Sequence, residues 1–380
     1  MRERAKIMLA FGTRPEAIKM APLCKYLEVM TQFNTQIVVT AQHREMLDTV
    51  LSLFDIKPTY DLDLMSPNQT ITDITTRVLK GMGKILEIEK PNLLVVHGDT
   101  TTTFAAALAG YYNQIPVGHV EAGLRSGNIY SPYPEEMNRI LADAISEIHF
   151  APTDGNKNNL INSGVKKERI YVTGNTVIDA LHMVVKDNYI FKEPSLNIID
   201  YLNNKVILLT SHRRENWGKG MEKIFYAVKS IIQSNSEVIF IFPVHPNPLI
   251  RDLAYKILGS NKRIHLIEPL DYVQFANLMS RVYMIMTDSG GIQEEAPSLG
   301  KPVLVLRTET ERPEAVLAGT VKVVGVEPEN VVKEVELMIN NTYLYQKMAN
   351  AVNPYGDGKA SKRITEAISN WLKLQGYHMN

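Results

Sequence analysis

A short segment in the second half of the chain, residues 288–297 (DSGGIQEEAP), has the residue types of an anion-binding turn. It follows an apolar run, 283–287, that is typical of a buried parallel strand, and it leads into a short helix. Ser289, Gly290 and Gly291 at such a turn let backbone N–H groups face an anion, which the helix dipole also favours. Glu294 or Glu295, one turn further on, could then accept hydrogen bonds from hydroxyl groups. The pattern suits a nucleotide diphosphate and its ribose, and an ordinary helix cap is the alternative.

Three carboxylates follow predicted strands in the first half of the chain. Asp99 comes after the strand 93–97, Glu121 ends the strand 117–121, and Glu135 opens a helix. A helix cap would also explain Asp99, and the helix dipole alone would explain Glu135. A carboxylate at the end of an apolar strand is costly unless it has a partner. We expect the three side chains to lie at one edge of a sheet, where they could serve as general acids and bases.

Basic and imidazole side chains follow other predicted strands. Arg14 and Lys19 come after the first strand, at a turn that is neither a P-loop nor a dinucleotide-binding fingerprint. His212 and His245 follow the first two strands of the second half, and Arg312 lies beyond a later one. Histidines and carboxylates together can bind zinc, but no metal-binding spacing such as HExxH occurs. We therefore expect acid–base chemistry and no metal.

The elements that must position these residues alternate between strands and helices. A helix is predicted over 70–89, and twelve strands are predicted at 6–11, 36–40, 93–97, 117–121, 148–151, 170–173, 206–210, 238–243, 264–267, 283–287, 303–306 and 321–324. This alternation predicts parallel sheets that are buried on both faces. Six plus six strands predict two doubly wound, Rossmann-like α/β domains, 1–175 and 176–360, with a last helix within 361–380 returning to the first. Ligands of such sheets bind beyond the carboxyl ends of strands, so we expect a cleft between the domains.

Composition excludes several classes of protein. The chain has 380 residues, 45% of them hydrophobic, and its 41 basic and 41 acidic residues give a formal net charge of zero, which argues against nucleic-acid binding. The single cysteine, Cys24, excludes an internal disulfide and a cysteine-cluster metal site. The start of the chain lacks the apolar region of a secretory signal, and no apolar run approaches the roughly 20 residues of a membrane span. We expect a cytoplasmic protein that does not enter a membrane.

Many of these segments together resemble one family. The chain is similar, along nearly its full length, to the bacterial non-hydrolysing UDP-N-acetylglucosamine 2-epimerases. The matching segments are 11–22 (FGTRPEAIKMAP), 41–47 (AQHREML), 96–103 (VHGDTTTT), 116–125 (PVGHVEAGLR), 131–138 (SPYPEEMN), 173–180 (TGNTVIDA), 212–215 (HRRE), 243–248 (PVHPNP), 287–305 (TDSGGIQEEAPSLGKPVLV), 310–315 (TERPEA) and 353–358 (NPYGDG).

The resemblance implies a fold, a reaction and a set of site residues. The fold is the two-domain GT-B type of the glycosyltransferases, in a homodimer. The reaction is the reversible conversion of UDP-N-acetylglucosamine to UDP-N-acetylmannosamine, through loss of UDP to a 2-acetamidoglucal and its re-addition, without NAD or metal. The product would supply bacterial surface polysaccharides. The family's catalytic residues match Asp99, Glu121, Glu135 and His212. Its UDP contacts match Arg14, Lys19, His245, Ser289, Gly290, Gly291, Glu295 and Arg312.

The resemblance also implies activation by a second UDP-N-acetylglucosamine. The matching positions are Gln42, His43, Gln69, Glu136 and Arg213. Some relatives carry a basic residue where this chain has Asn68, which cannot supply that charge. Three alternatives to the main interpretation remain: a hydrolysing epimerase, a GT-B glycosyltransferase and a non-catalytic sensor of nucleotide sugars.

Overall fold

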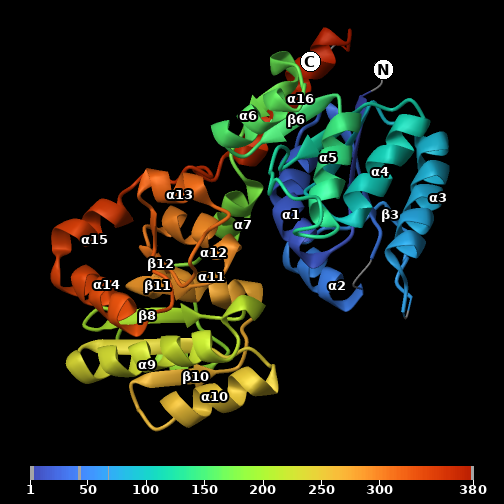
Figure 1. Ribbon diagram of the computed structural model, residues 1–380. Coiled ribbons are helices and arrows are strands. Elements are labelled where there is room, and N and C mark those ends of the chain that lie inside the picture. Colours follow the sequence, from blue (N-terminus) through green and yellow to red (C-terminus); the bar gives the residue numbers. More distant parts are fainter. Residues whose placement is uncertain (1–3, 42–43, 67, 378–380) are drawn as a thin grey trace. The chain divides into compact units, whose positions relative to one another are not determined.

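The computed structural model describes residues 4–41, 44–66 and 68–377. The chain divides into two compact units (Figure 1). Unit 1 comprises Met1–Ala180 and Tyr355–Asn380, and unit 2 comprises Leu181–Pro354. Each unit contains one parallel β-sheet with helices on both faces.

Unit 1 is built on a seven-stranded sheet with the order β3-β2-β1-β4-β5-β6-β7. Its strands are β1 (Ala5–Phe11), β2 (Phe33–Val39), β3 (Tyr60–Asp61), β4 (Leu93–His97), β5 (Val117–Val120), β6 (Ile148–Ala151) and β7 (Ile170–Val172). Its helices are α1 (Arg14–Glu28), α2 (Arg44–Leu53), α3 (Ile71–Glu89), α4 (Thr101–Tyr112), α5 (Glu135–Ile145), α6 (Asp154–Asn162), α7 (Thr176–Val184), which runs into unit 2, and α16 (Ala360–Leu374). Helix α16 packs against α1.

The apolar residues of unit 1 explain these layers. Along β1, Met8 and Ala10 belong to a core shared with α3 and α4, whereas Ile7 and Leu9, of opposite parity, are also fully buried. A strand whose two faces are both apolar must be covered on both sides. Helix α3 begins at a capping box in which Thr70 and Asp73 bond each other's backbone N–H groups.

Unit 2 is built on a six-stranded sheet with the order β10-β9-β8-β11-β12-β13. Its strands are β8 (Lys205–Thr210), β9 (Val238–Pro243), β10 (Ile264–Ile267), β11 (Met284–Thr287), β12 (Val303–Val305) and β13 (Val321–Val323). Its helices are α8 (Pro194–Asn197), α9 (Lys219–Ser234), α10 (Pro248–Leu258), α11 (Tyr272–Arg281), α12 (Gly290–Glu295), α13 (Pro313–Ala318), α14 (Pro328–Asn340) and α15 (Thr342–Ala349). Strands β8, β9 and β11 share one apolar core with α9, α10 and α14.

The predicted α/β class, with two doubly wound parallel sheets, is confirmed. All twelve predicted strands occur, with ends that differ by up to three residues. The prediction of six strands in the first sheet was wrong, because the two-residue β3 pairs with the edge of β2. So short a strand has no apolar run to reveal it. Strand β5 ends at Val120 rather than Glu121, because Glu121 has a left-handed backbone with φ of 66°.

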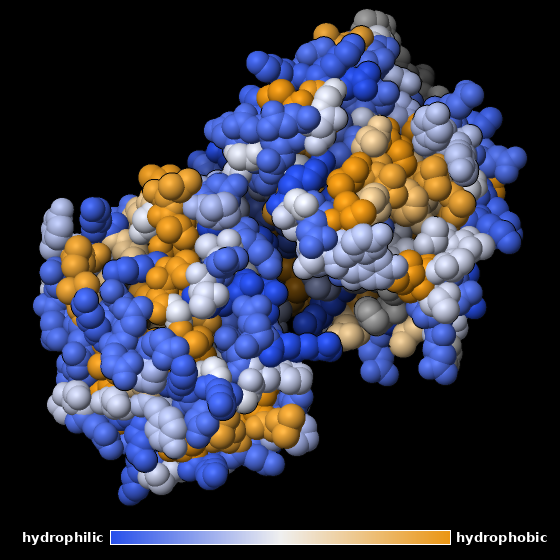
Figure 2. Space-filling view, in the orientation of Figure 1, coloured by the Kyte–Doolittle hydropathy of each residue, from blue (hydrophilic) through white to orange (hydrophobic). Residues whose placement is uncertain are grey.

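The surface that Figure 2 shows is mostly hydrophilic, although hydrophobic residues gather over α4 and α5 of unit 1 and in smaller areas of unit 2. Isolated exposed apolar side chains, such as Leu202 and Leu317, are ordinary on a folded protein. Within the described residues, no helix is long and apolar enough to cross a membrane.

Candidate active site

In each sheet the order of the strands reverses between the first and the fourth strand of that unit. Predicted site residues follow these strands. In unit 1, β1 and β4 are neighbours, and in unit 2, β8 and β11 are neighbours. Crossovers on the two sides of such a point leave in opposite directions, so a crevice opens beyond the carboxyl ends of the strands. The turns that carry Arg14, Asp99, His212 and Ser289 lie at these two points. Arg14 itself is the exposed first residue of α1.

Glu121 lies among polar partners directly after β5. Its side chain is 6% exposed, and Lys19 Nζ lies 2.6 Å from Oε1 and 2.7 Å from Oε2. Asn175 Nδ2 donates to Oε1 at 3.3 Å, and His97 Nε2 lies 3.1 Å from Oε2. Burial lowers the pKa of His97 to about 3, so this imidazole is neutral beside the carboxylate. Lys19, predicted as a UDP contact, is thus paired with a predicted catalytic carboxylate.

Asp99 is connected to the start of α5. Arg139 of α5 donates to Asp99 Oδ2 from Nε at 3.0 Å and from Nη2 at 2.7 Å. Asn138 Nδ2 donates to the Asp99 carbonyl at 2.9 Å. Helix α4 is capped by Thr100 rather than by Asp99, so capping does not explain this carboxylate. A Cβ atom on Gly98 would lie 3.6 Å from Glu121 Oε2, which places Glu121 against the turn that carries Asp99.

Glu135 and Glu136 are neighbours in α5 with different surroundings. Glu136 is buried, and it accepts hydrogen bonds from the Ser126 and Gly127 N–H groups and from Arg139. Glu135 Oε2 is buried, and none of the residues that the structure describes donates a hydrogen bond to it. A buried oxygen without a donor is costly, so a ligand hydroxyl would be favoured there.

Glu16 connects the turns after β1 and β4, a role that the sequence analysis did not assign. Its carboxylate accepts from the Gly12 and Thr13 N–H groups at 3.1 and 2.7 Å, and from Thr100 Oγ1 at 2.7 Å. Burial raises the pKa of Glu16, and these hydrogen bonds offset only part of that effect. The signal was present in the sequence, since Thr13 and Glu16 have the spacing of a capping box.

Asp288 organises the corresponding turns of unit 2, and it too was left without a role. This fully buried carboxylate accepts from the N–H groups of His212 and Arg213, each at 3.0 Å, and from Asn216 Nδ2 at 3.0 Å. Ser211 Oγ donates to it at 3.1 Å. Asp288 therefore holds the 211–216 segment against the turn that begins α12.

His212 and His245 lie side by side at the ends of β8 and β9. Their rings are stacked, with centroids 6.4 Å apart and an interplanar angle of 14°. The side chain of His212 is 43% exposed, and its Nδ1 lies 3.4 Å from Asp288 Oδ1. Burial, Arg213 and His245 lower the pKa of His212, while Asp288 opposes the shift. The free protein thus favours the neutral imidazole at this position.

Two guanidinium groups flank the start of α12. A Cβ atom on Gly290 would lie 3.7 Å from Arg213 Nη2 and 3.8 Å from Arg312 Nη2. Nothing lies within 4 Å of the corresponding position on Gly291, and the Ser289 side chain does not cap the helix. The turn thus combines backbone N–H groups, a hydroxyl and two cations, which suits a diphosphate.

The two glutamates of α12 have different environments. Glu294 is buried and forms an ion pair with Arg312, which positions that guanidinium. Glu295 is partly exposed, and it lies close enough to Tyr272 to help raise the pKa of that hydroxyl, although burial is the larger cause. Of the two carboxylates, Glu295 is therefore the better candidate for a ligand ribose.

The residues predicted to bind an activator belong to both units or lie outside the described part of the chain. Gln42 and His43 lie outside the described residues. Gln69 immediately precedes the Thr70 cap of α3, and its Oε1 is buried. Arg213 lies beside Gly290, so it faces the predicted diphosphate turn. Within residues 4–41, 44–66 and 68–377, no group of three or more His, Cys, Asp or Glu could hold a metal ion.

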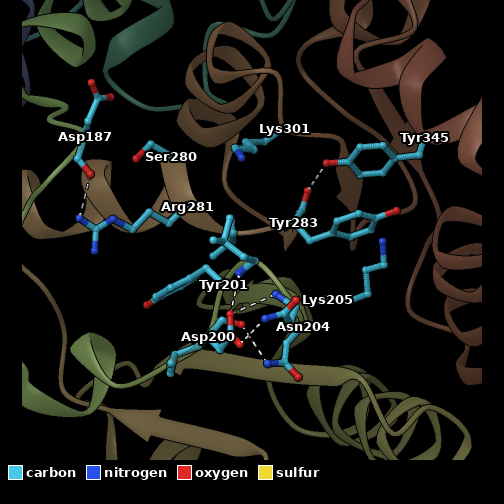
Figure 3. Close-up of a pocket in the computed structure, with 14 residues that line it drawn as sticks. Asp187, Asp200, Tyr201, Asn204, Lys205, Ser280, Arg281, Tyr283, Lys301 and Tyr345 are labelled. Atoms are coloured by element: carbon cyan, nitrogen blue, oxygen red, sulfur yellow. Dashed lines mark hydrogen bonds between the residues drawn. The ribbon is translucent and has the colours of Figure 1, made fainter.

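A cavity of about 730 Å³ lies in unit 2, away from the predicted site residues (Figure 3). Its lining includes Lys205 and Tyr283, which lie at or before the start of β8 and β11, the opposite ends from the anion-binding turn. Arg281 donates to the Asp187 and Tyr189 carbonyls, and Tyr345 donates to the Tyr283 carbonyl. The Arg281 bonds stabilise the segment that leads into β8, and the Tyr345 bond holds the residue before β11.

The chain is similar to known proteins over most of its length. The sequence model of the family described as UDP-N-acetylglucosamine 2-epimerase matches residues 25–369. The UDP-N-acetylglucosamine 2-epimerase of Escherichia coli K12 is 51% identical over 96% of this chain and 98% of its own, and that of Bacillus subtilis is 50% identical over 96% and 95%. The crystal structure of UDP-GlcNAc 2-epimerase from Neisseria meningitidis bound to UDP-GlcNAc is 50% identical, with a TM-score of 0.85 over 96% of this chain and 100% of that one.

Identity near one half over almost the whole of each chain, a matching family model and a shared fold lead to one conclusion. The chain belongs to the UDP-N-acetylglucosamine 2-epimerase family.

Proposed function

We propose that this chain is the non-hydrolysing type of epimerase, which interconverts UDP-N-acetylglucosamine and UDP-N-acetylmannosamine without releasing a free sugar. The Neisseria relative, which is bound to UDP-GlcNAc, supports the substrate. The observation that carries the proposal is the arrangement around Glu121, which lies against the Asp99 turn, while Arg139 connects Asp99 to the helix that Glu135 begins. Such a set of carboxylates could move a proton to and from both faces of one sugar carbon.

The proton on sugar C2 is hardly acidic, so the reaction needs a step that makes it easier to remove. We propose that the bond between sugar C1 and the UDP oxygen breaks, with its electron pair leaving on UDP. Positive charge then develops at C1, which acidifies the C2 proton, and a carboxylate removes that proton to leave a C1=C2 double bond. A proton returns to the opposite face of C2, and the UDP oxygen adds back to C1. Groups on both faces are required, which one carboxylate could not supply.

The residues divide between the two tasks. We propose Asp99, Glu121 and Glu135 as the proton-transfer groups, and Ser289, Gly290, Gly291, Arg312, Arg14 and His245 as contacts for UDP. His212 would face the departing diphosphate. Lys19 contacts both carboxylate oxygens of Glu121 and so fixes the position of this group. The proposal includes no NAD and no metal ion, since proton transfer with a departing UDP balances the reaction.

Hydrolysis and sugar transfer are the alternatives, and isotope exchange separates them. The protein is incubated with UDP-N-acetylglucosamine alone in heavy water. We expect UDP-N-acetylmannosamine that carries deuterium at C2, because solvent exchanges with the carboxyl protons. Free N-acetylmannosamine together with UDP would indicate a hydrolysing enzyme. Epimerised product without deuterium would contradict the proposed proton transfer, and the absence of any product would reject epimerisation. We further propose that the product supplies N-acetylmannosamine for bacterial surface polysaccharides.

A further inference from the structure

A fully buried histidine in β5 contacts two hydrogen-bond acceptors. His119 Nδ1 lies 2.6 Å from Asp143 Oδ1, and His119 Nε2 lies 2.7 Å from the carbonyl oxygen of Gly98. A carbonyl oxygen can only accept, and an ionised carboxylate can only accept. Both ring nitrogens must therefore donate, which requires the doubly protonated imidazolium.

The surrounding charges agree with this assignment. Burial lowers the pKa of His119, but the ion pair with Asp143 and the hydrogen bonds to Asp143 and Gly98 outweigh burial, so the pKa is raised. Burial raises the pKa of Asp143, but His119 and Arg125 outweigh it and hold the carboxylate ionised. Arg125 Nη2 lies 2.8 Å from Asp143 Oδ2.

Two further histidines face this cluster from the neighbouring strands. His97 comes from β4, and His149 from β6 bonds the Asp143 carbonyl at 2.9 Å. Burial lowers the pKa of both, so both are neutral. The charged groups around this cluster are Asp143 at His119, Arg125 at Asp143, and the Glu121–Lys19 pair at His97.

The three contacts of this cluster lead to the three segments that carry the proposed proton-transfer groups. Gly98 immediately precedes Asp99. Asp143 lies two turns along α5, the helix that begins at Glu135. Arg125 lies four residues beyond Glu121, in the segment that follows β5. His119 and Asp143 together thus connect a turn, a helix and a loop that are distant in sequence.

We propose that the His119 imidazolium is a positioning residue, which holds the segments of Asp99, Glu121 and Glu135 in fixed relation without touching substrate. The proposal rests on the proposed function of those carboxylates. A buried ion pair contributes little to stability compared with apolar residues of the same volume, but its hydrogen bonds are directional. Directional bonds are what a site with several proton-transfer groups needs, because a misplacement of about 1 Å can cost about 10²-fold in rate.

The first test is the protonation state of His119 in the unaltered protein. We expect the ¹⁵N shifts of its imidazole to show two protonated nitrogens at neutral pH. A neutral His119 there would overturn the proposal. This measurement needs no variant, so it decides even if the substitutions below prevent folding.

The second test is the Asp143→Asn variant, which removes the charge that keeps His119 protonated. We expect kcat to fall by about 10- to 100-fold at neutral pH, with KM changed less than kcat because the proposed UDP contacts of unit 2 are intact. A lower pH protonates His119 again, so the ratio of variant to wild-type kcat should rise as pH falls, although the Arg125–Asp143 ion pair stays lost. A merely structural defect would give a ratio that does not depend on pH, and that result would contradict the proposal.

His149→Gln is the matched control, because it removes a buried histidine that bonds the same helix. We expect its kcat ratio to stay near one at every pH, and a pH-dependent loss equal to that of Asp143→Asn would also contradict the proposal. Failure of the proposed function can be distinguished from failure of the positioning role. In the former case the wild-type protein itself would produce no deuterated UDP-N-acetylmannosamine.

Discussion

Glu121 combines several unusual features in one residue. It is a non-glycine residue with φ of 66°, its carboxylate is nearly buried, and it is held by Lys19, Asn175 and the neighbouring His97. A left-handed backbone costs free energy for a residue with a Cβ atom, and a buried carboxylate costs more unless it is paired. Strained or otherwise unfavourable residues of this kind are concentrated at functional sites, where a side chain must keep a fixed position.

We expect Glu121→Gln and Glu135→Gln each to lower kcat by about 10²- to 10⁴-fold, the usual contribution of a general acid or base. Substrate affinity should change less, because the proposed UDP contacts are other residues. The measurement is kcat and KM for UDP-N-acetylglucosamine by NMR of the product. Glu147→Gln serves as control, since the partly exposed Glu147 forms an ion pair with the partly exposed Arg169 and lies outside the predicted site residues. Near-wild-type turnover in Glu121→Gln would return Glu121 to a structural role.

His212 should respond to bound UDP through its charge. Burial is the main reason that its pKa is lowered in the free protein, and a diphosphate beside it would raise that pKa. Binding would then take up a proton. UDP should therefore bind less tightly as pH rises from the lowered pKa of the free protein to the raised pKa of the complex.

NMR titration of His212 with and without UDP measures the shift directly, and His265, whose pKa is also lowered by burial, is an internal reference. Calorimetry of His212→Asn should show less proton uptake than the wild type. An unchanged His212 pKa on saturation with UDP would place the diphosphate elsewhere.

At the scale of elements, two adjacent residues of the short helix α12 have different expected roles: Glu294 in stability and Glu295 in UDP binding. We expect Glu295→Ala to weaken UDP binding by about 1.5–3 kcal/mol if its hydrogen bonds to the ribose are charge-assisted. The Tm should be nearly unchanged because Glu295 is partly exposed. Glu294→Ala should lower the Tm, because it removes one half of a buried ion pair.

Calorimetric UDP titration and thermal unfolding of the two variants provide the comparison. If Glu294→Ala weakens UDP binding as much as Glu295→Ala with no loss of Tm, the assignment of the ribose to Glu295 is wrong.

The elements show what a sequence pattern can and cannot predict. Apolar runs located the twelve longer strands, and polar residues at their ends located the turns of Asp99, His212 and Ser289. Contacts between distant segments could not be predicted in this way. The bond from His119 to Asp143, the four donors around Asp288 and the pairing of Lys19 with Glu121 depend on three-dimensional neighbours. Strand β3 was missed because two residues form no pattern.

At the scale of the whole molecule, the two units share one topology and differ in chemistry. In each sheet the first four strands have the order 3-2-1-4 when numbered within the unit, so each has its crevice at the same topological place. Acidic side chains follow the strands of unit 1 around that place, and cations with a glycine turn follow those of unit 2. One architecture used twice would thus supply the proposed proton-transfer groups in unit 1 and the proposed anion-binding turn in unit 2.

The final prediction concerns activation of the whole enzyme by its own substrate. A ligand can shift a protein between states only if it prefers one of them, so activation requires a second UDP-N-acetylglucosamine that binds the active state more tightly. The test is the reverse reaction from pure UDP-N-acetylmannosamine, which we expect to start with a lag that a trace of UDP-N-acetylglucosamine removes.

Gln69→Ala should lengthen the lag without lowering the rate finally reached, because the buried Gln69 Oε1 has no hydrogen-bond donor among the described residues and is a candidate ligand contact. Immediate conversion at full rate, with no response to the other sugar, would exclude activation and leave the epimerase assignment intact, since the forward reaction always contains the activator.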